Sequence, residues 1–76
     1  MFLELKVLKF CMKRLKELRE ERNMTKAELA KATGIKARMI GHYEAGTREP
    51  GKISTIKIFC DYFGVTADYL LGFSEF

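Results

Sequence analysis

Arg38 and His42 can both hydrogen-bond to nucleic-acid bases, and they lie four residues apart. On a helix this spacing places them on one face. An arginine near the start of a helix in a major groove can donate two hydrogen bonds to O6 and N7 of guanine, and the imidazole can donate to a base or a phosphate. His42 is the single histidine of the chain, so it lacks partners for a metal site or for acid–base catalysis. These residue types favour recognition; a solvated or phosphate-bound Arg38 and an exposed His42 without a role are the alternatives.

The segment 26–45, which contains this pair, predicts two short helices joined by a tight turn. We expect the first helix over about 26–33 and the second over about 37–45. Thr25 can cap the first helix with its hydroxyl, and Glu28 lies three residues later, where it completes a capping box. The second helix is the element that must position the two base-binding side chains.

The turn between these helices has a characteristic residue pattern. Gly34 ends the first helix, because glycine enters the left-handed region without a Cβ clash. Ala30 is small enough for the two helices to cross closely, and Ile40 and Tyr43 give the second helix an inward face. A small residue, a glycine and a branched apolar residue at this spacing are typical of a DNA-binding helix-turn-helix.

Three further helices are expected around this unit, over 12–22, 53–63 and 67–71. Short connections between them indicate an all-α, compact five-helix bundle. Apolar residues recur at helical spacing in the fourth helix, at Ile53, Ile56, Phe59, Cys60 and Phe63. The residues expected in the core are Leu15, Leu18, Leu29, Ile40, Tyr43, Ile56, Phe59, Phe63, Val65 and Leu70. A cofactor pocket is the alternative for this apolar set.

Length and composition limit the classes of protein. The 76 residues suffice for one domain and leave no room for a separate catalytic one. Cys11 and Cys60 have no CxxC spacing, which favours reduced thiols over a disulfide or a metal site. No apolar run reaches the ~18 residues of a membrane span. Charged residues near the start of the chain argue against a signal peptide.

The charge of the chain is unevenly distributed. The net charge is +4, with +3 in residues 1–22, +3 in residues 23–52 and −2 in residues 53–76. The positive part therefore contains the predicted base-binding helix, which suits a polyanion such as nucleic acid. A lysine-rich surface that only keeps the protein soluble is the alternative.

Residues 1–11 form an apolar arm whose structure the sequence leaves open. Leu3, Leu5 and Val7 alternate with charged residues, which favours a strand, whereas Leu5 and Leu8 also fit a helical stripe that continues into 12–22. A lone strand is marginal in water, so an ordered arm needs a partner. We therefore divide the chain into an arm (1–11), a helix-turn-helix domain (12–72) and a C-terminal tail (73–76).

Apolar residues beyond those needed for the core suggest a homodimer. The expected dimer contacts are Leu3, Leu5, Val7, Ile58, Tyr62, Phe73 and Phe76. A two-fold dimer would place two base-binding helices about one DNA turn apart, ~34 Å, as a palindromic site requires.

Three segments carry a resemblance to a known family: RLKELREERNMTKAELAKATGI, MIGHYEAGTREP and FGVTADYLLG. In their order and spacing, the chain resembles the phage-repressor and Cro-like helix-turn-helix family, also called XRE or lambda-repressor-like, over about four fifths of its length. The resemblance implies a five-helix bundle that binds palindromic operators as a homodimer.

The resemblance also implies roles for individual residues. Base reading falls on the outward face of the second helix of the pair, at Ala37, Arg38, Gly41 and His42. Phosphate contacts fall on Lys26, Lys36, Thr47, Arg48 and Lys52, for which ordinary surface residues are the alternative. Arg19 and Glu44 match an ion pair that the family forms between the first and third helices. We expect this pair to have a structural role, and the sequence leaves open whether it is buried or exposed.

The chain departs from the family pattern at several positions. Lys36 replaces the Ser or Thr that caps the third helix, at a cost of about 1 kcal/mol. Thr33 replaces an apolar residue of similar volume. Gly41 in a helix interior costs about 1 kcal/mol relative to alanine and removes one base-reading side chain.

The sequence thus predicts a sequence-specific transcriptional regulator, a repressor, that binds double-stranded DNA as a dimer in the cytoplasm of a bacterium, encoded by the bacterium or a phage and associated with the nucleoid. The alternative is an antitoxin-like or anti-regulator module that binds a protein partner through the same fold. We expect no enzyme, since no nucleophile–base pair, carboxylate pair or metal cluster is present. We likewise expect no cofactor, no small-molecule substrate and no membrane association.

Overall fold

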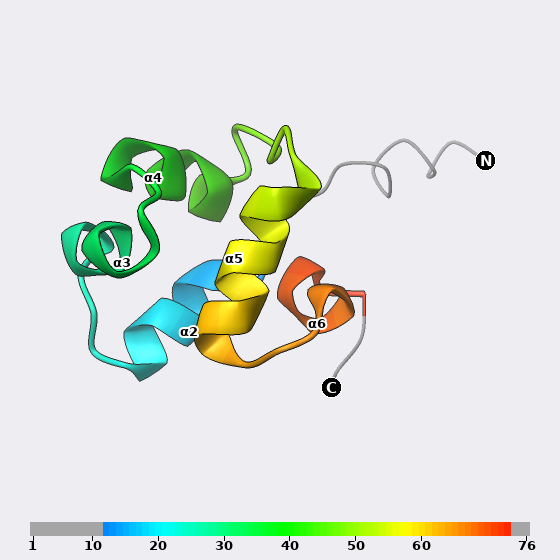
Figure 1. Ribbon diagram of the computed structural model, residues 1–76, viewed down its shortest axis with the longest axis horizontal. Coiled ribbons are helices and arrows are strands. Elements are labelled where there is room, and N and C mark those ends of the chain that lie inside the picture. Colours follow the sequence, from blue (N-terminus) through cyan, green and yellow to red (C-terminus); the bar gives the residue numbers. More distant parts are fainter. Residues whose placement is uncertain (1–11, 74–76) are drawn as a thin grey trace.

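The computed structural model describes residues 12–73, which form five helices and no strand (Figure 1). The all-α prediction is confirmed, and four of the five helices have the predicted bounds. The helices are α2 (Leu15–Glu21), α3 (Lys26–Thr33), α4 (Ala37–Ala45), α5 (Ile53–Phe63) and α6 (Ala67–Leu71). The predicted arm with Leu3, Leu5 and Val7, and Phe76 of the tail, lie outside the described residues.

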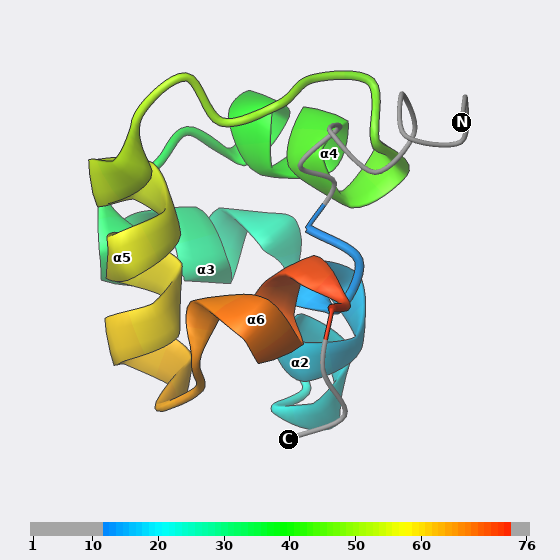
Figure 2. The same ribbon diagram turned by 90° about the vertical axis from the view of Figure 1, so that its right-hand side faces the viewer.

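The helix pair α3 and α4 forms one end of the molecule, and α6 lies toward the other end, with α5 between them (Figure 1). Figure 2 shows α4 above α3, and α6 running from the lower half of α5 toward the segment that leads into α2. The helix pair therefore projects from a base formed by the remaining helices.

The core consists of one cluster of apolar side chains. Its buried members are Met12, Leu15, Leu18, Leu29, Ile40, Tyr43, Phe59, Phe63 and Leu70. Ile56 and Val65, predicted in the core, are only partly buried and pack against it. Ile53, expected on the same helical stripe, is 82% exposed, because the first turn of α5 extends beyond the cluster.

Helix α2 begins at Leu15 and not at residue 12, so the predicted start is wrong by three residues. The backbone N–H of Arg14 donates to the carbonyl oxygen of Leu70 at 3.1 Å, and that of Leu15 donates to the carbonyl oxygen of Met12 at 3.1 Å. Residues 12–14 thus form a turn bonded to α6 instead of a further helical turn. This tertiary bond has no signature in the local sequence.

The end of α2 and the start of α3 are both capped. Asn23 adopts a left-handed conformation with φ 55°, and the N–H of Met24 donates to the carbonyl oxygen of Arg19, as in a Schellman motif. At the start of α3, the N–H of Glu28 donates to Thr25 Oγ1 at 3.1 Å, and the N–H of Thr25 donates to Glu28 Oε1 at 2.8 Å. The predicted capping box is confirmed.

The turn from α3 to α4 depends on two residues. Gly34 has φ 83°, the left-handed conformation that was predicted. The hydroxyl of Thr33 donates to the carbonyl oxygen of Leu29 at 2.8 Å and accepts from the N–H of Ile35 at 3.3 Å. The hydroxyl of Thr33 therefore connects α3 to the turn. From its volume alone, Thr33 was expected only to take the place of an apolar side chain. Lys36 provides no side-chain cap for α4, as expected.

Two glycine-to-alanine substitutions should change stability in opposite directions. A Cβ at Gly41 would lie 3.8 Å from Lys26 Nζ, an ordinary contact, so Gly41→Ala should stabilise the helix by about 1 kcal/mol. Gly34→Ala would force an L side chain into the left-handed region, at a cost of about 1–2 kcal/mol. Urea denaturation of both variants measures the difference, and a destabilising Gly41→Ala would contradict the packing described here.

Candidate nucleic-acid interface

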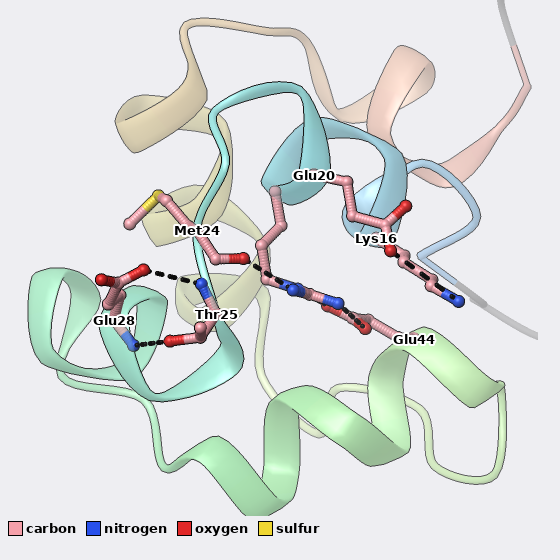
Figure 3. Close-up of polar contacts among 7 residues, drawn as sticks. Lys16, Glu20, Met24, Thr25, Glu28 and Glu44 are labelled. Carbon is pink, nitrogen blue, oxygen red and sulfur yellow. Dashed lines mark hydrogen bonds and ion pairs between the residues drawn. The ribbon is translucent and has the colours of Figure 1, made fainter.

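Arg19 makes a buried, two-pronged ion pair with Glu44, which connects α2 to α4 (Figure 3). Its Nε donates to Glu44 Oε2 at 2.7 Å, and its Nη2 donates to Glu44 Oε1 at 3.1 Å. The side chains of Arg19 and Glu44 are 10% and 5% exposed. The sequence left open whether this pair is buried or exposed, and in the structure it is buried. The hydrogen bond with Glu44 raises the pKa of Arg19 against the opposing effect of burial, so the guanidinium stays charged.

The same guanidinium also bonds to the turn between α2 and α3. Arg19 Nη1 donates to the carbonyl oxygen of Met24 at 2.7 Å (Figure 3). The side chain of Arg19, which belongs to α2, therefore contacts both α4 and the turn that leads into α3. These three bonds restrict how the helix pair can rotate against α2.

The inward side of α4 determines which of its residues face solvent. Ile40 and Tyr43 are buried, and the Tyr43 ring meets Phe59 of α5 edge-on at 6.4 Å between centroids. At about 100° per residue, the positions between them turn away from the core. Arg38 is exposed, and the other predicted base-reading residues, Ala37, Gly41 and His42, are partly exposed.

His42 and Thr47, for which sequence reasoning assigned separate roles, are hydrogen-bonded to each other. His42 Nδ1 lies 2.9 Å from Thr47 Oγ1, and the backbone N–H of Thr47 donates to the carbonyl oxygen of His42 at 3.0 Å. The left-handed Gly46 turns the chain back over the last turn of α4 and so brings them together. Thr47 fixes the imidazole through Nδ1, which leaves Nε2 as the ring nitrogen that a ligand can bind.

The side chain of Lys26 from α3 lies beside Gly41 of α4, within 4 Å of the position of an added Cβ. Lys26 also lines a hollow of about 160 Å³, together with Lys16, Gly41, Glu44 and Ala45. Lys16 of α2, also 4.0 Å from Glu20 (Figure 3), was missed as a member of this surface. Its position follows from the crossing of α2 and α4, which helical spacing along α2 does not reveal.

The predicted phosphate-binding cations remain available to an anion. Lys26, Lys36, Arg48 and Lys52 are exposed, and neither they nor Arg38 form an ion pair within residues 12–73. In contrast, the exposed cation Lys57 on α5 binds Asp61 at 3.1 Å. Unpaired positive charge is therefore concentrated on α3, α4 and the loop that follows α4.

Two further findings concern metal binding and membrane spans in the described part of the chain. No group of three His, Cys, Asp or Glu side chains in residues 12–73 is placed to hold a metal ion. None of the helices there has the length and apolar character of a membrane span. Cys60 is half-buried, and burial raises the pKa of its thiol; Cys11 lies outside the described residues.

Two short helices with a left-handed glycine turn, and a second helix with an exposed arginine, define a helix-turn-helix DNA-binding domain. A helix-turn-helix family model (HTH_3) matches residues 15–70, and the chain belongs to this family. The resemblance stated from the sequence is thereby confirmed.

The chain is similar to a curated protein from Bacillus subtilis (strain 168), described as the uncharacterized HTH-type transcriptional regulator YobD. The two are 32% identical over 62 residues, which cover 82% of this chain and 54% of that protein. The chain thus spans about half the length of this relative. No solved structure matches the chain.

Removing Glu44 should destabilise the fold strongly. Glu44→Ala leaves the guanidinium of Arg19 buried without its carboxylate, and we expect a loss of ~3–5 kcal/mol in the free energy of unfolding. Asp61→Ala, which breaks the exposed pair with Lys57, should cost less than about 1 kcal/mol. Equal, small losses for the two variants in urea denaturation would show that the buried pair does not hold α2 and α4 together.

Proposed function

We propose that this chain is a transcriptional regulator that binds double-stranded DNA sequence-specifically, with α4 in the major groove. The observation that carries the proposal is the exposed, unpaired Arg38 on a helix whose rotation is restricted by the buried Arg19–Glu44 pair. The family and the name of the Bacillus relative support the same function. The free cations of α3 and α4 favour DNA over the antitoxin-like or anti-regulator role.

In this proposal four residues of α4 face the base edges. Arg38 donates two hydrogen bonds to a guanine, and Ala37 contacts a thymine methyl. His42, held through Nδ1 by Thr47, binds a base or a phosphate through Nε2. Gly41 presents no side chain, so it allows the bases to approach the backbone of α4.

Phosphate groups on both sides of the groove would bind the surrounding cations. Lys26 and the N-terminal N–H groups of α3 face one strand, where the helix dipole also favours an anion. Lys36 lies in the turn before α4, and Thr47, Arg48 and Lys52 lie in the loop after it. Such contacts position the protein and carry no sequence information.

We further propose a homodimer that acts as a repressor on a palindromic operator. Phe73, Tyr62 and Ile58 are 54%, 40% and 37% exposed, so each can contribute to a dimer contact. Tyr62 is already engaged within the chain, since its hydroxyl donates to Met24 Sδ at 3.6 Å. The contacts expected from Leu3, Leu5, Val7 and Phe76, and the cytoplasmic, nucleoid-associated location, stay predictions.

Arg38 and Arg48 should differ in what they contribute to binding. Arg38→Ala should cost ~1–3 kcal/mol and flatten the preference at one base pair of each half-site. Arg48→Ala should weaken binding about equally for all sequences, since a phosphate contact does not depend on the base. Selection of bound duplexes from a random pool measures both, and a uniform loss for Arg38→Ala would contradict base reading by α4.

Binding should weaken steeply with salt, because each phosphate contact releases counterions. With ~6–10 contacts per dimer, the affinity should fall by about 10³–10⁵ between 50 and 200 mM salt. Fluorescence anisotropy of a labelled duplex measures the slope. An affinity that does not change with salt would argue against the assigned cations.

A further inference from the structure

The hydrogen bond between His42 and Thr47 determines what His42 can recognise, because its proton can belong to either residue. The Thr47 hydroxyl lies 2.9 Å from Nδ1 of His42, and a hydroxyl can donate to a ring nitrogen or accept from it. If the hydroxyl donates, the proton of the neutral ring lies on Nε2, which is then a donor. If Nδ1 donates, Nε2 has only a lone pair and is an acceptor.

The surroundings of the Thr47 hydroxyl favour donation to Nδ1. A second acceptor within its reach is the carbonyl oxygen of His42 at 3.4 Å, which is longer than the usual O–H···O distance of about 2.5–3.0 Å. This carbonyl oxygen already accepts the backbone N–H groups of Gly46 and Thr47, and it has two lone pairs. The hydroxyl proton therefore has its best-placed acceptor at Nδ1.

The same contacts orient the ring before any ligand binds. The backbone N–H of Thr47 donates to the carbonyl oxygen of His42 at 3.0 Å, so the backbone and the side chain of Thr47 both bind His42. His42 lies one helical turn after the exposed Arg38 on α4. An imidazole that is already ordered loses less conformational entropy on binding than one that rotates freely.

We propose that Thr47 is a positioning residue that keeps the proton of neutral His42 on Nε2, so that His42 recognises the hydrogen-bond acceptors of a base. This inference rests on the proposed binding of DNA by α4. In the major groove guanine offers O6 and N7 and thymine offers O4, which are acceptors, whereas cytosine offers its N4 amino donor. His42 therefore favours guanine or thymine over cytosine at the base that faces Nε2.

The proposal gives Thr47 a different role from a phosphate contact. A hydroxyl that donates its proton to Nδ1 has none left to donate to a phosphate oxygen. A phosphate contact strengthens binding to every sequence, whereas a residue that acts through His42 changes the preference at one base pair. The two roles therefore predict different results when the hydroxyl of Thr47 is removed.

The ring nitrogens report the position of the proton in the full chain without DNA. His42 is the single histidine of the chain, so a long-range proton–nitrogen NMR spectrum at about pH 8, where free histidine is neutral, shows one imidazole. We expect the frequencies of an unprotonated Nδ1 and a protonated Nε2. Thr47→Ser, which keeps the hydroxyl, should give the same frequencies, whereas Thr47→Val should move both toward those of a tautomer mixture.

A protonated Nδ1 in the unmodified chain would overturn the proposal, and so would ring frequencies that Thr47→Val leaves unchanged. The backbone amide signals of Leu29 and Ile40, which are fully buried in the core, report whether each variant is folded. Thr47→Ala repeats the test with a smaller side chain and should give the same result as Thr47→Val.

Selection of bound duplexes from a random pool tests which bases His42 recognises. In the unmodified chain and in Thr47→Ser, cytosine should be depleted on the order of tenfold against guanine or thymine at one position of each half-site, because two facing donors leave each other unsatisfied. Thr47→Val should largely remove this depletion. Arg48→Ala is the matched control from the same loop, and it should weaken binding to all sequences and keep the depletion.

The outcomes separate the two roles of Thr47. A uniform loss of affinity for Thr47→Val, with the depletion of cytosine unchanged, would overturn the proposal and make Thr47 a phosphate contact. Enrichment of cytosine at this position would overturn it as well. A chain that binds no duplex would contradict the proposed function and base recognition by His42, even where the imidazole spectrum confirms the position of the proton.

Discussion

The arrangement of this domain depends on the buried ion pair between Arg19 and Glu44. Burying two charges costs several kcal/mol, and the interaction recovers this only if the geometry is good and the remaining donors are satisfied. Here two parallel hydrogen bonds join the side chains, and a third donor of Arg19 bonds to Met24. The net stability from such a pair is small. Its main consequence is the orientation of α4, because the bonds to Arg19 restrict how α4 can rotate against α2.

Local structure was predictable wherever the residues that end a helix are themselves distinctive. Helices α3, α4, α5 and α6 have the expected bounds because left-handed glycines end each of them, and threonine caps begin two. The start of α2 was not predictable, since the bond between Arg14 and Leu70 arises only once α6 packs against α2. Ile53 fits the helical stripe of α5 but lies beyond the core, which a periodic pattern cannot indicate.

The candidate site was predictable as a set of residues and not as a set of contacts. The outward positions of α4 follow from the burial of Ile40 and Tyr43, which the sequence indicated. The hydrogen bond between His42 and Thr47 depends on how Gly46 turns the chain, and the approach of Lys26 to Gly41 depends on the crossing of α3 and α4. Arg19 and Glu44, 25 residues apart, were paired through the family resemblance.

The central claim is that the surface formed by α4 and the loop after it is the one that meets DNA. An NMR titration of the isotope-labelled protein with duplex DNA at low salt tests this most directly, because non-specific binding already engages the phosphate contacts. The account predicts shifts in the backbone signals of Ala37–Ala45 and residues 47–52, with those of Ala67–Leu71 unchanged. Shifts confined to α5 and α6 would contradict it.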